Sequence, residues 1–339
     1  MTIPATEIGL GDLQALRGAG LIAAQRYPTA VNAIRDEAFW VRWGLRALLA
    51  LGAGQFLAGV VFFFAYNWND LSDIAKFAIV EGALAIAALG ALVVGLDRMF
   101  GQVLLSAASL LTGVLLATIG QVYQTGADVF ELFLAWAALI LPWTLISRSA
   151  VQWLLWLVVA EVALWLYCEQ VPMVVGGMTE DELSVLSGAT IVLALIAREI
   201  AVRLGCLWLG AHWTRLVLLF AAILILFMAA AGSVLDIYTA EAPALCIGVF
   251  AAVSVAGAFV YWRKLPDFAA LVIIIAFVDA LFICIGFRLI EESIGFSWSQ
   301  AGTGLGSLGA MILWAIASTG GSAMAMRWLR SDLRAAGAL

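Results

Sequence analysis

Long apolar runs, each bounded by polar residues, Gly or Pro, follow one another along most of the chain. A run of about 20 residues is long enough to cross roughly 30 Å of hydrocarbon as an α-helix. The runs are continuous rather than alternating, which favours helices over the strands of a closed barrel. The pattern predicts about ten spans, with the limits 44–66, 74–95, 101–121, 129–147, 150–167, 183–203, 214–234, 243–262, 266–287 and 302–326.

Composition supports the same class of protein. The 339 residues are 65% hydrophobic and 12% charged, with a mean hydropathy of +1.07. A soluble domain carries about 25% charged residues. Residues 1–42 are polar and mixed in charge, so the chain does not open with the pattern of a cleavable signal peptide. We therefore predict an all-α polytopic membrane protein that lies in a lipid bilayer.

The basic residues predict an orientation. If the N-terminus is cytoplasmic, fifteen of the seventeen Lys and Arg residues fall on the inner side, and only Lys76 and Arg288 fall outside. The outer loops instead collect Asp and Glu. This asymmetry is the one that cytoplasmic loops show in membrane proteins. An even number of spans returns the chain to the inside, so both termini are predicted to be cytoplasmic.

Three regions follow from this topology. Residues 1–42 are predicted to form a small helical cytoplasmic region, residues 43–327 the transmembrane helical bundle, and residues 328–339 a short cytoplasmic tail. Pro28-Thr29 is read as a break and cap before a helix that contains Val31 and Ile34. The N-terminal region is interpreted either as a packing element at the membrane face or as a docking site for a cytosolic partner.

Three carboxyl groups fall inside predicted spans, where charge is costly. Glu81, Glu161 and Asp279 each lie about seven or eight residues from the outer end of their span, roughly 10–12 Å deep at 1.5 Å per residue. Low dielectric favours the neutral form of a carboxylic acid, which suits a proton-coupled carrier. We expect these acids to bind protons or substrate in one layer. Hydrogen bonds between helices, made by protonated carboxyls, are the structural alternative.

Two hairpins on the predicted outer side are rich in polar residues. In GQVYQTGADVFE (120–131), the side chains predicted to help bind substrate or protons are Gln121, Tyr123, Asp128 and Glu131. The two hairpins are predicted to cap an outward-facing cavity. The capping residues are Gln124 of this hairpin and, in YNWNDLSDIAK (66–76), Asn67, Asn69, Asp70, Asp73 and Lys76. Helix capping alone is a sufficient alternative for the aspartates. A site for a hard cation such as Ca²⁺ on Asp70, Asp73, Asp128 and Glu131 is a further alternative.

Other chemistry is disfavoured. The single histidine, His212, falls on the predicted cytoplasmic side, away from the outer acids, so a His-based zinc site or a Ser–His–Asp triad is not expected there. No metal and no cofactor is predicted, and Glu199 with Arg203 reads as an ordinary helix pair. Dispersed basic residues without interleaved aromatics argue against nucleic acid. Disulfides between Cys168 and Cys246, or between Cys246 and Cys284, are left open.

The segments FFFAYNWNDLSDIAKFAIVEGAL (62–84) and GQVYQTGADVFELFLAWAALILPW (120–143), with GLI (20–22), resemble the bacterial membrane family catalogued as domain of unknown function 2157. The resemblance covers about residues 10–145. It implies a bacterial inner-membrane protein with a small cytoplasmic N-terminal region. No activity, cofactor or catalytic residue comes with it.

Two functions are consistent with these patterns. The first is a carrier for a small or lipid-like molecule, with an outward-facing acidic cavity coupled to protons or a cation. The second is a non-catalytic subunit or assembly factor of a cell-envelope complex, with a membrane or envelope protein as its partner. An enzyme that acts on lipid is disfavoured, because the outer face lacks a histidine.

Overall fold

The fold was analysed in a computed structural model, which describes residues 13, 16, 21–23, 26–35, 37–66, 68–124, 126–171, 177–235, 242–294 and 304–335. These residues fold into helices joined by short turns, and no strand occurs among them. The chain divides into two units, Met1–Lys76 and Phe77–Leu339. The all-α class predicted from the sequence is confirmed.

The first unit contains α2 (Tyr27–Ile34), α3 (Glu37–Tyr66) and a 3₁₀ turn, η1 (Trp68–Asp70). The predicted helix with Val31 and Ile34 is α2. Its start was misplaced slightly, because Pro28 lies within the first turn rather than before it. That position suits proline, whose missing N–H is one that a helix start leaves unpaired anyway. The predicted boundary between residues 42 and 43 falls inside α3.

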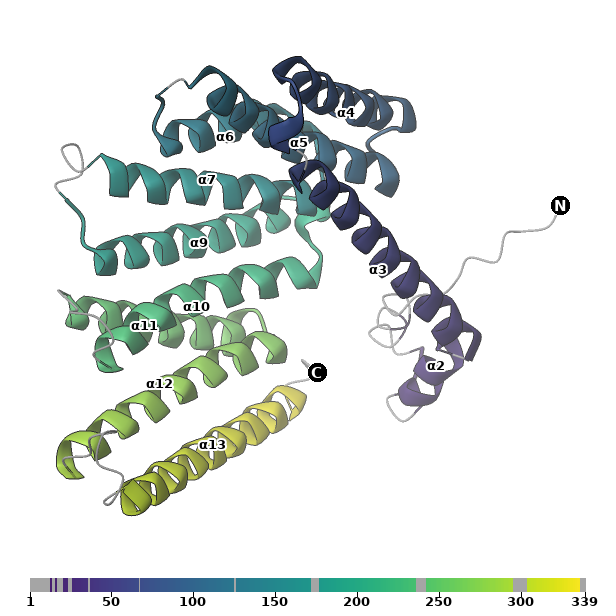
Figure 1. Cartoon of the computed structure of the whole chain (residues 1–339). Helices are drawn as coiled ribbons and strands as arrows, with labels where there is room; N and C mark the ends of the chain where they lie inside the picture. Colours follow the sequence, from purple (N-terminus) through teal and green to yellow (C-terminus); the bar gives the residue numbers. More distant parts are fainter. Residues whose placement is uncertain are drawn as a thin grey trace. The chain divides into compact units, whose positions relative to one another are not determined.

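Most of the second unit consists of long helices (Figure 1). Helix α4 (Asp73–Val94) begins at the end of the first unit and continues into the second. The remaining elements are α5 (Met99–Tyr123), α6 (Val129–Ser147), α7 (Ala150–Gln170), α9 (Glu180–Arg203), η2 (Leu207–Leu209), α10 (His212–Leu235), α11 (Pro243–Phe259) with its π-helical continuation η3 (Val260–Lys264), α12 (Phe268–Ile294) and α13 (Gly304–Ala335).

Nine helices in the described ranges are long and apolar enough to cross a membrane. They are α4, α5, α6, α7, α9, α10, α11 with η3, α12 and α13, and each contains most or all of one predicted span. The first predicted span, 44–66, lies within α3, which is not among the nine. Helix α13 continues to Ala335, so the predicted start of a tail at residue 328 falls inside a helix.

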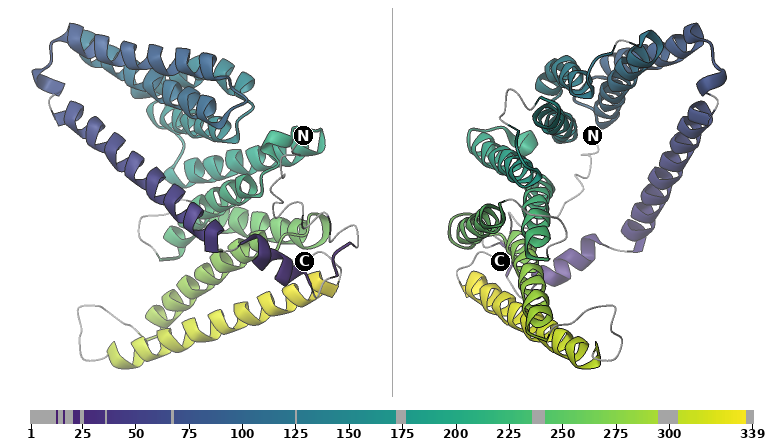
Figure 2. Two further views of the ribbon diagram at one scale, coloured as in Figure 1. Left: turned by 90° about the vertical axis from the view of Figure 1, so that its right-hand side faces the viewer. Right: turned by 60° about the vertical axis from the view of Figure 1, so that its left-hand side comes forward.

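Helix α10 is the centre of the larger core. It packs against α9, α11 and α12, while α13 packs against α12, alongside which it lies in Figure 1 and in both views of Figure 2. Half of the most apolar stretch of α10 is buried. A smaller core lies between α6 and α7. The fully buried side chains of the larger core include Ile223, Leu226, Phe250, Leu271 and Ile274.

Many large apolar side chains face outward instead of into these cores. Ile86, Leu92 and Val93 on α4, and Leu313 and Ile316 on α13, are more than half exposed. Such surfaces are unfavourable in water but match hydrocarbon, which is as apolar as leucine. All four cysteines carry free thiols, which settles the disulfides left open above.

Candidate functional site

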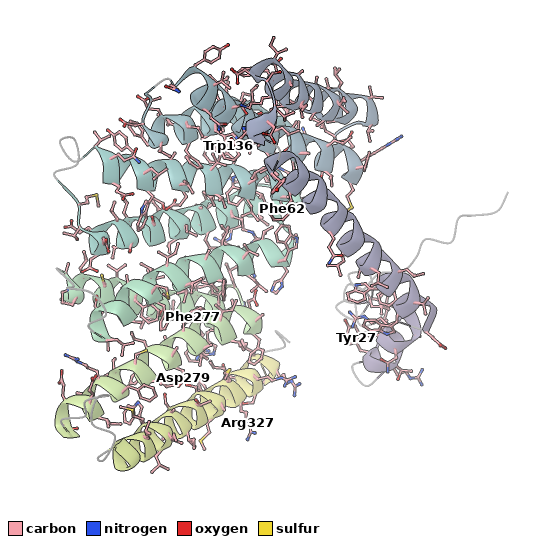
Figure 3. The ribbon with its side chains drawn as sticks, in the orientation of Figure 1. Tyr27, Phe62, Trp136, Phe277, Asp279 and Arg327 are labelled. Carbon is pink, nitrogen blue, oxygen red and sulfur yellow. The ribbon has the colours of Figure 1, made fainter. Side chains whose placement is uncertain are left out.

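Asp279 lies near the middle of α12 and faces α13 (Figure 3). The hydroxyl of Ser318 on α13 donates a hydrogen bond to Asp279 Oδ1. Both residues line a pocket of about 470 Å³ formed by α11, α12 and α13. A carboxyl group inside a membrane is stabilised by such a polar partner on a neighbouring helix. As far as the structure describes the chain, the lining contains neither Glu81 nor Glu161.

The pocket exists because α13 presents small side chains at this level. Ala317, Gly321 and Ala325 recur every fourth residue and therefore share one face of the helix. A Cβ placed on Gly321 would meet no atom within 4 Å. The opposite wall is apolar and is supplied mainly by α12, with Phe282 as its aromatic member.

Ser254 on α11 is the second polar group of interest in this pocket. Its side chain is 3% exposed, and its Oγ has no hydrogen-bond partner among the described residues. An unpaired hydroxyl in a low-dielectric site is costly. Sequence reasoning missed Ser254, because one serine in an apolar run looks like any other.

Glu161 on α7 forms a separate polar contact with α9. Its Oε2 accepts a hydrogen bond from the Thr190 hydroxyl at 2.7 Å, while its Oε1 is buried without a partner in the described chain. The same hydroxyl lies 2.8 Å from the carbonyl oxygen of Ser187. One hydroxyl proton serves one acceptor well. The Glu161 carboxyl and the Ser187 carbonyl therefore compete for the single proton of the Thr190 hydroxyl.

Glu81 is exposed on α4. In the helices as observed, Glu161 is eleven residues after Ala150 and Asp279 eleven residues after Phe268, while Glu81 is thirteen residues before Val94. These three helix ends all belong to the predicted cytoplasmic side. Helix tilt relative to the bilayer decides whether equal register means equal depth, so the common layer stays a prediction.

The predicted polar residues of the 120–131 segment lie at the end of α5 and the start of α6. All five of the predicted side chains in this segment are exposed: Gln121, Tyr123, Gln124, Asp128 and Glu131. Asp128 occupies the predicted N-cap of α6, but its side chain makes no capping hydrogen bond. The Tyr123 ring lies 5.9 Å from that of Phe77, between centroids.

The first hairpin belongs to the other unit and differs in one detail from the prediction. The hydroxyl of Ser72 accepts a hydrogen bond from the Ala75 N–H at 3.4 Å, which is the capping role predicted for the aspartates. Asp73 instead pairs with Lys76, one turn later, at 3.3 Å. Asn69 and Asp70 are exposed. Asn67 and Thr125 lie outside the described residues.

A second pocket, of about 500 Å³, lies between α6 and α7. Its lining is apolar apart from Tyr167 and the indole of Trp156, whose N–H already donates to the Ala137 carbonyl at 3.0 Å. In the part of the chain that the structure describes, no three His, Cys, Asp or Glu side chains gather as a metal ion requires. The Asp279 pocket is therefore the better candidate for a chemically selective site.

The densest polar cluster lies elsewhere, where α9, α10 and α12 meet the η2 connection. Arg215 makes two hydrogen bonds to Glu199, from Nε to Oε1 at 2.7 Å and from Nη2 to Oε2 at 3.0 Å. Its Nη1 donates to Asp267 Oδ2 at 2.9 Å. Arg198 Nη1 also donates to Glu199 Oε1, at 2.6 Å. The predicted pair of Glu199 with Arg203 was wrong, because Arg198 and Arg215 occupy its carboxylate.

Arg198 anchors the η2 connection as well. Its side chain is 2% exposed, and it donates to the carbonyl oxygens of Leu209 at 3.1 Å and Ala211 at 3.0 Å. A further contact joins its Nε to the Thr214 hydroxyl at 3.2 Å. The Thr214 hydroxyl also lies within hydrogen-bond distance of both carbonyl oxygens, at 3.0 and 2.7 Å, so Arg198 and Thr214 together hold the turn before α10. The cluster is a structural clamp.

Asp267 completes the clamp from the turn before α12. Burial acts to raise the pKa of Asp267, but hydrogen bonds from Arg215, the Ala270 N–H and His212 outweigh burial and hold the pKa below its usual value. His212 Nε2 lies 2.8 Å from Asp267 Oδ2, and its side chain is 57% exposed. Sequence spacing could not have paired these residues, which are 55 positions apart.

The helices define an all-α multi-pass membrane protein, and the Asp279 pocket lies among three of the helices that are long enough to span a bilayer. The family model described as "Predicted membrane protein (DUF2157)" matches residues 14–153, which confirms the predicted resemblance over that stretch. The match ends near the start of α7, so it does not reach the Asp279 pocket. The chain matches no curated protein and no solved structure.

Proposed function

We propose that the protein is a carrier in the bacterial inner membrane, with both termini cytoplasmic, that moves a small or lipid-like molecule in exchange for protons or a cation. The pocket around Asp279 carries this proposal. Its volume of about 470 Å³ falls within the range of small-molecule sites. A carboxyl at mid-helix, held by a serine of a neighbouring helix, can bind and release a proton.

Glu161 supports the proposal as a second proton-binding group. Its Oε2 contacts the Thr190 hydroxyl, which has a second acceptor in the Ser187 carbonyl oxygen. In this scheme Asp279 binds substrate or proton in its pocket, while Glu161 loads or releases a proton between α7 and α9. Residues of the 120–131 hairpin, together with Glu81, serve the outer access path.

Reconstitution into liposomes tests the proposal. Vesicles that contain a trapped pH-sensitive dye and the purified protein are given a proton gradient and a panel of apolar cations, anions and neutral amphiphiles. We expect at least one class of compound to drive proton flux above that of protein-free vesicles. Asp279→Asn should reduce this flux at least about a hundredfold, the lower end of the range for positioned proton-transfer groups. Glu161→Gln should also reduce it.

Two controls match these variants. Glu292→Gln changes another acid of α12, an exposed one that pairs with Arg288 at 2.9 Å, and Glu169→Gln changes an exposed acid of α7. Both should retain wild-type flux. Flux equal to that of protein-free vesicles for every compound would contradict the carrier, and the envelope-subunit interpretation would then take its place.

A further inference from the structure

The charge of the Asp279 pocket indicates which ligands it selects. Asp279 is the one ionisable residue among its described lining residues. The hydroxyl of Ser318 donates a hydrogen bond to the carboxyl oxygen Oδ1. An ionised carboxylate in an apolar site remains costly until a positive charge compensates it. A cationic ligand is therefore attracted, and an anionic one is repelled.

The body of the ligand follows from the walls. The lining is mostly aliphatic and includes Val255, Ile275 and Val278, while Phe282 adds an aromatic ring. Aromatic rings attract cations through their negative faces. A hydrophilic cation would lose its hydration shell here without replacement, whereas an apolar body gains contact with the walls.

Ser254 indicates a hydrogen-bond donor on the ligand. Serine and threonine in apolar helices usually donate to the carbonyl one turn earlier, as Ser109 and Thr112 do in α5, at 3.0 Å each. Ser254 makes no such bond in the described chain, although its hydroxyl is buried beside the pocket. Its oxygen therefore has an acceptor position that no group of the described chain uses.

We propose that the Asp279 pocket binds lipophilic ammonium ions, with the cationic nitrogen paired to the Asp279 carboxylate and its N–H donating to Ser254. This inference rests on the proposed carrier function for its physiological meaning, but binding itself requires no transport.

A pair of probes with nearly the same shape and opposite charge tests the electrostatic part. Equilibrium binding of tetraphenylphosphonium and tetraphenylborate is measured on the purified, detergent-solubilised full chain. We expect saturable binding of the phosphonium and at least about tenfold weaker binding of the borate. Asp279→Asn should weaken phosphonium binding at least about tenfold, which corresponds to 1.4 kcal/mol. Glu292→Gln should leave it unchanged, and each variant must show the wild-type melting temperature.

A second probe tests the role of Ser254. 1-Naphthylmethylammonium carries N–H donors, whereas tetraphenylphosphonium has none. Ser254→Ala should weaken binding of the ammonium about threefold to tenfold, the effect of one hydrogen bond, and leave phosphonium binding unaltered. Equal loss for both probes would show that Ser254 only shapes the pocket and would overturn its assigned role.

The outcomes separate the two proposals. Equal affinity for phosphonium and borate, or full phosphonium binding by Asp279→Asn, overturns the ligand class and leaves the carrier function standing on its flux assay. Selective binding without flux in any vesicle supports the ligand class and overturns the carrier.

Discussion

Arg215 of α10 and Glu199 of α9 face each other in a two-pronged ion pair, with N–O distances of 2.7 and 3.0 Å. The planar guanidinium matches the carboxylate at both oxygens, which a lysine could not do. Arg198 and Asp267 extend the pair, so two arginines face two carboxylates and the cluster is close to neutral. A polar cluster as buried as this one is tolerated because its charges are balanced and hydrogen-bonded.

Removal of one partner from this clamp should be strongly destabilising. We expect Arg215→Gln to lower the free energy of unfolding by about 3 kcal/mol, since Glu199 would keep only Arg198, and Asp267 only His212, as a side-chain partner among the described residues. Thermal unfolding in detergent, followed by tryptophan fluorescence, measures the effect. Arg203→Gln is the matched control, because Arg203 is exposed at the end of α9. Equal melting temperatures for the two variants would contradict a structural clamp.

Asp267 should make stability depend on pH in the acid range only. Its pKa is lowered in the folded chain, so its ionised form stabilises the fold above the unfolded value of about 3.9. That contribution is lost as the pH falls through the lowered folded pKa. The difference in melting temperature between wild type and Asp267→Asn should therefore be constant from about pH 7 to 5 and shrink below about pH 4. A difference that disappears near neutral pH would be inconsistent with this assignment.

The helices could be predicted because crossing hydrocarbon imposes one dominant pattern. A run of about 20 apolar residues has no other way to satisfy its backbone in lipid, so length and hydropathy suffice. The α6 limits, Val129–Ser147, coincide with the predicted span. Helix α13 was predicted too short, because its last turns contain arginines that mark the end of a hydrophobic run without ending a helix.

The polar contacts could not be predicted in the same way. Glu199 has a plausible partner four residues away on its own helix, but its actual partner Arg215 comes from the next helix, sixteen positions on. Local spacing describes only one helix surface, whereas the packing of α9 against α10 decides which charges meet. Asp279 was found from its cost in an apolar run. Ser254 was not found from the sequence. What distinguishes it is that its buried hydroxyl has no hydrogen-bond partner among the described residues, which only the structure reveals.

Gly113 of α5 allows a close approach that any larger residue would block. A Cβ at this position would lie 2.5 Å from the ring of Trp136, whose indole N–H donates to the Ser109 carbonyl at 2.8 Å. We expect Gly113→Ala to destabilise the fold by about 1–3 kcal/mol, the usual cost of overpacking. Displacement of the ring should also change the tryptophan emission spectrum.

Gly120 provides the control on the same helix. A Cβ there meets nothing within 4 Å. Gly120→Ala should be neutral or should stabilise the helix by up to about 1 kcal/mol, because alanine has the higher helix propensity. Comparable destabilisation by both substitutions would mean that α5 responds to any added side chain and that the Trp136 contact is not the cause.

The predicted orientation is tested across one helix, α5, whose two ends carry exposed residues suited to labelling. Asp97 precedes α5 on the predicted cytoplasmic side, and Ala127 follows it on the predicted outer side. In a background where the four native cysteines are replaced by alanine, a membrane-impermeant maleimide should label Ala127→Cys in intact spheroplasts. It should label Asp97→Cys only after permeabilisation. The reverse pattern would show that the predicted orientation is wrong. The Arg215 clamp would then lie on the outer side, contrary to the positive-inside rule. Equal labelling of both before permeabilisation would show that α5 does not cross the membrane.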